Sequence, residues 1–217
     1  MLVSKIEYQK RDPSRVNIYL DDEFFCGISL STLASENLYE GLEIDDSVVQ
    51  RILERDLKSR FLTRVTEYIS RTPKTELQVR RYLRGLRFKK KNIWFKENIS
   101  LDWDIFFEDI VKKLKDYKYI DDEIFARTFV QSRVSYKPRG KNILVMELIS
   151  KGVSKDIANQ VCDEEIGDEL ELIGRTFRKK YKESKFNIKD FKMVSFLQRK
   201  GFSWDLIERF SRDDTTE

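Results

Sequence analysis

Histidine is absent from the 217 residues, and this absence removes most catalytic and metal sites from consideration. Triads with a histidine base and metal sites of the usual histidine, cysteine and carboxylate type both depend on it. The sequence also has no GxGxxG or GxxxxGKS/T loop that would hold a phosphate. No reaction is indicated, so we expect a protein that is not an enzyme and that needs no metal and no cofactor.

Cysteine and long apolar runs are scarce as well. The two cysteines, Cys26 and Cys162, lie in different regions and form no CxxC pair, so we expect core thiols rather than a disulfide. No apolar run reaches 18 residues, and no signal-peptide pattern is present. We therefore expect a cytoplasmic protein without a membrane partner.

Proline is rare, with three residues in the chain, whereas 37% of all residues are charged. This combination is typical of an elongated helical protein with much surface, and 217 residues are enough to bury a sizeable core. Function is then to be sought on a long surface rather than in one deep pocket.

What the chain does contain is an internal repeat. The string KGVSKDI at residues 151–157 returns 49 residues later as KGFSWDL at residues 200–206. In each copy the glycine favours the left-handed conformation that ends a helix, and the lysine suits the negative helix end. The serine is suited to cap the next helix. A period near 50 predicts a tandem array of small helical units.

The middle unit is expected to hold three short helices. Asp121 and Asp122 begin the first, which runs to about Ser135. Pro138 stands at the start of the second, where its fixed φ is harmless, and that helix stops at Gly152. The third begins at Ser154, whose side chain is suited to cap it, and buries its apolar face.

An earlier copy is interrupted by an insertion. Residues 101–105 match the second half of the unit, while residues 82–85 replace residues 149–152. Residues 86–99 are therefore extra. They mix aromatic and cationic side chains, as single-strand binders do, or they form a short hairpin whose aromatics pack on the array.

The N-terminal region alternates in hydrophobicity around a turn signal at Asp12-Pro13-Ser14. The predicted elements are strands at 5–10, 16–20 and 24–26, a short helix at 31–37 and a long helix from Asp45 or Asp46. The fold class is mainly α: three tandem three-helix repeats form an elongated curved array behind a small β-rich extension. The expected divisions are the extension (1–48), the linking helix and first repeat (49–118), the second repeat (119–168), the third repeat (169–212) and a disordered tail (213–217).

Charge is placed unevenly, although the formal net charge is only +4. Residues 1–58 hold 7 basic and 12 acidic side chains, whereas residues 59–96 hold 12 basic and 2 acidic ones. Residues 124–146 carry five basic side chains and no acid. Solvated helix faces would explain any single one of these residues, but the pattern as a whole indicates an anionic partner, with nucleic acid the obvious one.

The cations cluster where second helices are expected to begin. A helix N-terminus with exposed N–H groups and flanking cations is a phosphate site, and one such site in each repeat would follow a nucleic-acid backbone. The candidate contact residues are Arg71, Lys74, Arg80, Arg81, Arg84, Arg127, Arg133, Lys137, Arg139 and Lys141.

The middle repeat resembles a known family. The run YIDDEIFAR at residues 119–127, followed by Arg133, the string KPRG at residues 137–140, Leu148 and Lys151-Gly152-Val153, is similar to the signature of the RecX regulatory proteins. The resemblance covers about residues 59–212. The strand-like start is similar to an extension found in some members, whereas the insertion after Gly85 departs from the common pattern.

The resemblance implies a bacterial modulator of the RecA recombinase. It implies a protein that binds the RecA–DNA filament and inhibits ATP hydrolysis, strand exchange and recombination in DNA repair and the SOS response. We expect a monomer that contacts single- or double-stranded DNA through its phosphate backbone. Two other classes stay open: a general DNA- or RNA-binding helical-repeat protein, and a protein-interaction scaffold that acts without RecA.

Overall fold

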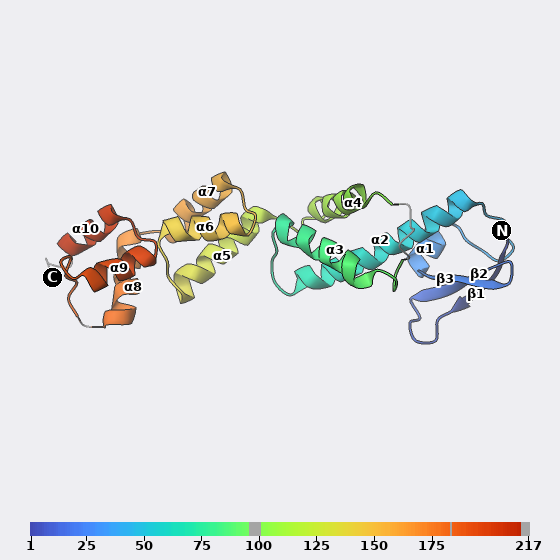
Figure 1. Cartoon of the computed structure of the whole chain (residues 1–217), viewed down its shortest axis with the longest axis horizontal. Coiled ribbons are helices and arrows are strands. Elements are labelled where there is room, and N and C mark those ends of the chain that lie inside the picture. Colours follow the sequence, from blue (N-terminus) through green and yellow to red (C-terminus); the bar gives the residue numbers. More distant parts are fainter. Residues whose placement is uncertain (96–100, 183, 214–217) are drawn as a thin grey trace. The chain divides into compact units, whose positions relative to one another are not determined.

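The computed structural model describes residues 1–95, 101–182 and 184–213, and these residues are mainly helical with one small sheet near the N-terminus (Figure 1). The mainly α class with a small β-rich start is therefore confirmed. The chain divides into two compact units. The first unit holds Met1–Arg71 and Arg80–Tyr117, and the second holds Thr72–Val79 and Lys118–Glu217. The predicted disordered tail, beyond residue 213, lies outside the described residues.

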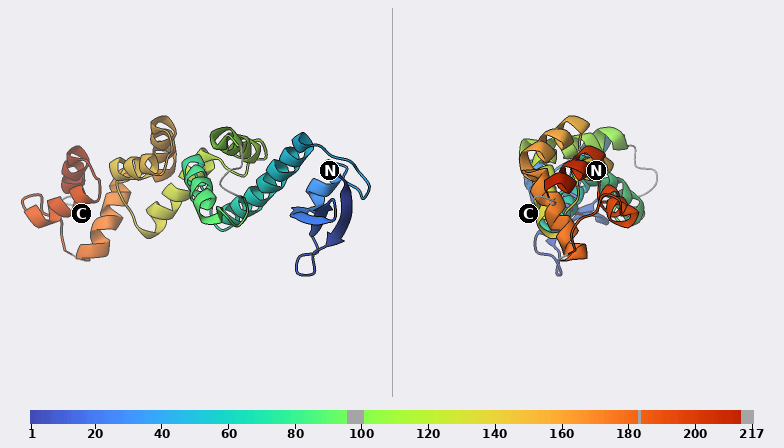
Figure 2. Two further views of the ribbon diagram at one scale, coloured as in Figure 1. Left: turned by 45° about the vertical axis from the view of Figure 1, so that its right-hand side comes forward. Right: turned by 90° about the vertical axis from the view of Figure 1, so that its left-hand side faces the viewer.

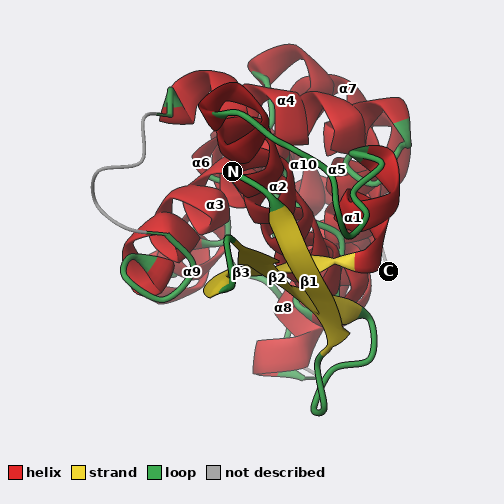
Figure 3. Cartoon of the chain, turned by 90° about the vertical axis from the view of Figure 1, so that its right-hand side faces the viewer, coloured by secondary structure: helices red, strands yellow, loops and turns green. Residues whose placement is uncertain are grey.

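Three antiparallel strands begin the first unit, in the order β1 (Val3–Tyr8), β2 (Arg15–Leu20) and β3 (Glu23–Ser29) (Figure 3). Alternate residues of β2 are buried, which is the pattern that the sequence predicts. The register pairs Ile6 with Ile18 and Val16 with Ile28. Helix α1 (Leu30–Ser35) follows directly, capped by the Ser29 side chain.

The sheet packs against helix α2 (Asp46–Ser70). Its N-cap is Asp45, whose carboxylate accepts a hydrogen bond from Val48 N, so the predicted start is confirmed. The buried Asp56 carboxylate on this helix lies 3.0 Å from the Arg15 guanidinium and 2.6 Å from that of Arg60. It also accepts the Ser29 N–H at 2.9 Å, so the buried charge is fully partnered and fixes the sheet on the helix.

Helices α3 (Glu76–Lys90) and α4 (Trp103–Asp116) complete the first unit, except for the first turn of α3. Helix α3 continues to Lys90, so residues 86–90 of the insertion are helical and belong to no hairpin. The packing of aromatics is confirmed for two residues: Trp94 contacts Phe61 and Phe95 contacts Trp103, at centroid distances of 5.6 and 4.8 Å. Residues 96–99 of the insertion lie outside the described residues.

The second repeat forms α5 (Asp122–Tyr136), α6 (Lys141–Ser150) and α7 (Lys155–Ile166), shown in yellow to gold in Figure 2. The predicted caps at Asp121 and Ser154 are confirmed. The expected start at Pro138 is wrong, because α6 begins at Lys141 with Gly140 as its N-cap. The proline therefore precedes the helix instead of occupying its first position.

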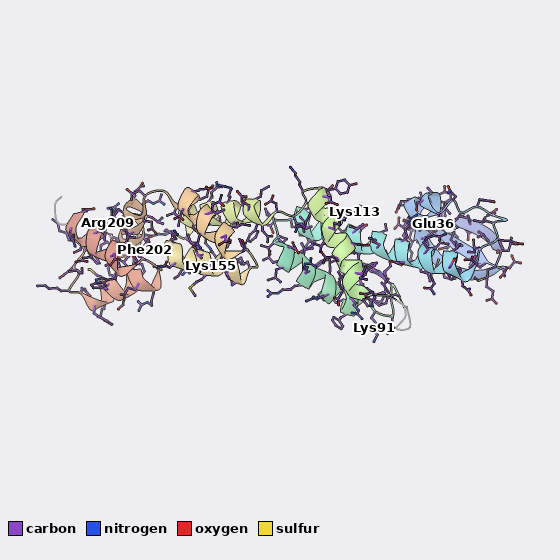
Figure 4. The ribbon with its side chains drawn as sticks, turned by 90° about the horizontal axis from the view of Figure 1, so that it is seen from above. Glu36, Lys91, Lys113, Lys155, Phe202 and Arg209 are labelled. Carbon is purple, nitrogen blue, oxygen red and sulfur yellow. The ribbon has the colours of Figure 1, made fainter. Side chains whose placement is uncertain are left out.

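The third repeat forms α8 (Glu169–Tyr181), α9 (Phe191–Arg199) and α10 (Trp204–Asp213). Its residues share one apolar core with those of the second repeat. Phe202, labelled in Figure 4, follows the helix-ending Gly201 and is 3% exposed. Among the described residues no helix combines the length and the apolar character needed to cross a membrane.

Candidate nucleic-acid interface

Two joints in the second unit are built in the same way. In the first joint, α6 ends before Gly152, which has a φ of +101°, and the start of α3 packs on this glycine. The Thr75 hydroxyl donates a hydrogen bond of 2.6 Å to the Lys151 carbonyl, and Leu77 lies where a Cβ on Gly152 would be. Only glycine fits both the positive φ and this close approach.

The second joint repeats this arrangement one repeat later. Helix α9 ends before Gly201, which has a φ of +91°, and the start of α6 packs on it. The Gly140 N–H donates a hydrogen bond of 2.8 Å to the Lys200 carbonyl, and Ile143 covers Gly201. Thr75 and Gly140 each stand two residues after a proline, so the two joints use equivalent positions.

At each of these two joints, one backbone N–H group at the helix start already has a hydrogen-bond acceptor within the chain. The Glu76 N–H donates to the Asp122 carboxylate at 2.9 Å, and the Gly140 N–H is bonded to the Lys200 carbonyl. The expectation that a phosphate binds to exposed N–H groups here is therefore wrong for these two groups.

Cations and an aromatic ring meet at the first joint. The half-buried Phe129 ring has the Arg133 guanidinium 4.8 Å and the Lys151 ammonium 5.3 Å from its centroid. A cavity of about 360 Å³ opens beside it. No acidic residue lines this cavity; the lining residues are Thr72, Pro73, Lys74, Gln78, Phe125, Thr128, Phe129, Ser132 and Lys151.

Positive charge is denser at the second joint. Burial lowers the pKa of Lys200, and the neighbouring charges of Arg139, Lys179 and Lys180 lower it further. The ammonium groups of Lys180 and Lys200 lie 4.3 and 5.5 Å from the centroid of the Phe196 ring. Because three neighbouring cations disfavour the charged form of Lys200, an anion is favourable at this place.

The two cation sets occupy equivalent positions. Lys74 and Arg139 each follow a proline, and Lys151 and Lys200 each precede a joint glycine. Asp121 caps α5 and Asp168 caps α8. Residues 132 and 179 each lie 11 positions after the cap of their helix, and residues 133 and 180 each lie 12 positions after it. We name the sets the first-joint site (Lys74, Ser132, Arg133, Lys151) and the second-joint site (Arg139, Lys179, Lys180, Lys200).

Glu147 on α6 connects the two sites. One of its carboxylate oxygens lies 3.0 Å from Arg133 Nε, and the other lies 3.5 Å from Arg139 Nε. One residue of each site, Arg133 and Arg139, therefore lies beside the same carboxylate.

The remaining candidate cations have other surroundings. Arg127 contacts three carboxylates, and Lys141 pairs with Asp163, while Lys137 is exposed. In the first unit, Arg80 pairs with Glu108 at 2.8 Å. Three further arginines of that unit are exposed: Arg71, Arg81 and Arg84.

Sequence reasoning missed Lys179, Lys180 and Lys200. The signal was present, because residues 174–182 hold five basic side chains and no acid. Only the fold shows that this run in α8 meets Lys200, which lies about twenty residues further along the chain. Among the described residues, no cluster of cysteine, aspartate and glutamate is arranged to hold a metal ion.

Comparison with known proteins identifies relatives along the whole chain. Residues 1–45 match the family model described as the regulatory protein RecX N-terminal domain, and residues 121–161 match the RecX second three-helix domain. Regulatory protein RecX from Bacillus velezensis is 28% identical over 99% of this chain and 80% of its own length. The protein of that name from Clostridioides difficile is 28% identical over 96% of this chain and 93% of its own length.

Solved structures show the same relationship. A crystal structure of regulatory protein RecX matches with a TM-score of 0.74 and 25% identity, and covers 97% of this chain and 98% of that one. RecX from Lactobacillus salivarius matches with a TM-score of 0.57 at 21% identity over 74% of this chain and 97% of that one, a likeness in fold.

Proposed function

Because the chain belongs to the RecX family of regulatory proteins, we propose that it binds the RecA–DNA filament and inhibits the ATPase and strand-exchange activities of RecA. The observation that carries this proposal is the pair of equivalent cation sites in the second unit, which are linked through the carboxylate of Glu147. A filament of protein and DNA presents phosphates at regular intervals, and a repeated cationic site suits such a partner.

The proposed contact residues fall into two groups. The central group consists of the first-joint and second-joint sites, which contain Lys74, Arg133 and Arg139 of the cations chosen from the sequence. The exposed Arg71, Arg81, Arg84 and Lys137 form a peripheral group. We assign Arg80, Arg127 and Lys141 an internal role, because each is paired with at least one carboxylate of its own, whereas Arg133 and Arg139 share the carboxylate of Glu147.

The proposal is tested by pull-down of the tagged protein with RecA alone, DNA alone and the assembled RecA–DNA filament, together with the ATPase rate of the filament. We expect the filament to be retained best and its ATPase rate to fall as the protein is added. Equal retention of naked DNA and filament, with an unchanged ATPase rate, would instead support a general nucleic-acid-binding protein. Retention of RecA alone, without dependence on salt, would support a protein-interaction scaffold.

A further inference from the structure

We propose that Glu147 is an internal competitor that limits binding: its carboxylate occupies the guanidinium groups of Arg133 and Arg139 in the free protein and releases them when an anionic partner arrives. The inference rests on the proposed function, because it concerns the regulation of the same surface. It assigns a role to an acid, whereas the proposed function is carried by cations. Three observations support it: the unequal contacts of the two arginines, their access to solvent, and the crowding of positive charge beside them.

The two guanidinium groups are held to different extents. Arg133 Nε donates a hydrogen bond of 3.0 Å to one carboxylate oxygen of Glu147. Arg139 Nε lies 3.5 Å from the other oxygen, and this buried nitrogen has no hydrogen-bond partner in the part of the chain that the structure describes. A buried donor without an acceptor costs free energy, so Arg139 gains a missing hydrogen bond when an external anion takes the place of Glu147.

Exchange of one anion for another requires access from solvent, and all three side chains have it. The exposed fractions are 30% for Arg133, 34% for Arg139 and 25% for Glu147. Water screens such a partly exposed ion pair, so it is weak enough to be replaced. Arg127 differs, because a partner would have to displace three carboxylates from it.

Repulsion among the cations explains why the free protein has an anion at this place. Burial lowers the pKa of Lys200, and the charge of Arg139 is the next cause. Glu147 lies beside Arg139 and partly neutralises it, so it reduces the repulsion as long as no partner is bound. Removal of this carboxylate should therefore act in opposite directions on two properties: the fold becomes less stable, and binding becomes tighter.

The test compares the wild-type full chain with Glu147→Gln, which keeps the shape of the side chain and removes its charge. The matched control is Glu171→Gln, which removes the same charge from an exposed position on α8. Binding to a labelled single-stranded oligonucleotide is followed by fluorescence anisotropy, and binding to the RecA–DNA filament by co-sedimentation. Circular dichroism gives the thermal midpoints.

We expect Glu147→Gln to bind both probes about twofold to fivefold more tightly than the wild-type protein, the range that corresponds to one partly exposed ion pair. Its thermal midpoint should be lower than that of the wild type, and added oligonucleotide should raise it again. Glu171→Gln should bind as the wild type does, because this residue competes for no guanidinium group.

A second background tests whether the gain depends on the two arginines. In the variant Arg133→Gln with Arg139→Gln, Glu147 has no guanidinium group to occupy, so the further change Glu147→Gln should leave the affinity unchanged. Equal gains in the two backgrounds would overturn the inference, as would equal gains for Glu147→Gln and Glu171→Gln, because net charge alone would then account for them.

The result for the proposed function is separate. Filament binding and inhibition that Glu147→Gln leaves unchanged would retain the proposed function and overturn the competitor. A wild-type protein that neither sediments with the filament nor lowers the RecA ATPase rate would refute the proposed function. The competitor would then be supported by a tighter oligonucleotide complex of Glu147→Gln that depends on the two arginines. If neither protein binds either probe, both proposals are refuted.

Discussion

Arg127 is the candidate cation with the most partners in its own chain. Its guanidinium lies 2.7 Å from Glu123, 2.5 Å from Glu164 and 2.9 Å from Glu165. The pKa of Glu164 is lowered by hydrogen bonds from Gln160 and Arg127. The pKa of Glu165 is lowered in the same way, first by Gln131 and then by Arg127. A cation with such surroundings connects α5 to α7 within the second repeat.

We expect Arg127→Leu to lower the thermal midpoint at pH 7 by more than Lys137→Leu, whose side chain is exposed. The folded pKa values of Glu164 and Glu165 are below the ordinary value of 4.5, so the stabilisation that these two carboxylates provide is complete above that pH and is lost as the pH falls through the folded pKa values. The difference between wild type and Arg127→Leu should therefore shrink below pH 4.5. Melting curves followed by circular dichroism at several pH values measure it, and equal midpoints of the two variants at pH 7 would contradict it.

The two thiols provide a second prediction at this scale. Burial raises the pKa of Cys26 to about 12, with a contribution from the charge of Asp56, and burial raises that of Cys162 to about 11. Because the thiolate is the reactive form, both cysteines should react slowly with a disulfide reagent between pH 7 and 9. Absorbance of the released chromophore measures the rate, and addition of denaturant is the control that should make both react at once. Fast reaction of the native protein would show that the thiols are accessible.

At the level of elements, the joint glycines are the positions most sensitive to change. We expect Gly152→Ala to reduce the free energy of unfolding by more than about 1 kcal/mol, because alanine resists a positive φ and its Cβ would meet Leu77. Denaturation with urea measures the loss.

Gly167→Ala is the matched control for this change. Gly167 also has a positive φ, of +68°, but no atom lies within 4 Å of the position that its Cβ would take. Its substitution should thus cost only the backbone strain. Equal losses at the two glycines would show that the packing of Leu77 on the joint contributes nothing.

Local signals were sufficient for most elements and insufficient for two. The caps at Asp45, Asp121 and Ser154 act within three residues, so the sequence predicts them correctly. The start of α6 was predicted wrongly because Gly140 has no capping side chain, and its N–H finds an acceptor only in Lys200, about sixty residues away. The continuation of α3 beyond Gly85 was missed because the repeat pattern stops there, although residues 86–90 are able to form a helix.

The residues of the candidate site were likewise predictable where the signal is local and not where it depends on long-range contacts. Arg133 and Arg139 were found from the basic stretch in one repeat, and Lys74 from its place beside a proline. Whether a cation is paired or available depends on acids such as Glu147 and Glu165, which lie elsewhere in the sequence and meet the cations only after folding. Spacing alone therefore did not separate Arg127 from the cations at the joints.

At the scale of the whole molecule, binding to a DNA-containing partner should depend strongly on salt. If about six phosphates are contacted, affinity should fall roughly a thousandfold between 50 and 200 mM salt. Co-sedimentation with the RecA–DNA filament across this range measures the effect, with RecA alone as the control for contacts that do not involve DNA. A filament affinity that does not change with salt would refute phosphate contacts as a source of binding.

The matching joints have a consequence for how such chains change in length. In the second and third repeats the second helix ends with a lysine whose carbonyl accepts one hydrogen bond, and the segment that packs on it supplies the donor, the Thr75 hydroxyl in one case and the Gly140 N–H in the other. A tandem duplication of the gene segment for residues 119–167 would insert a repeat that already carries a hydrogen-bond donor, the Gly140 N–H, and an acceptor, the Lys151 carbonyl. No buried polar group would lose its partner, so a chain with such a duplication should fold. Gain or loss of part of a repeat would leave a donor or an acceptor of a joint without its partner. Evolution of this chain is thereby biased towards steps of one whole repeat.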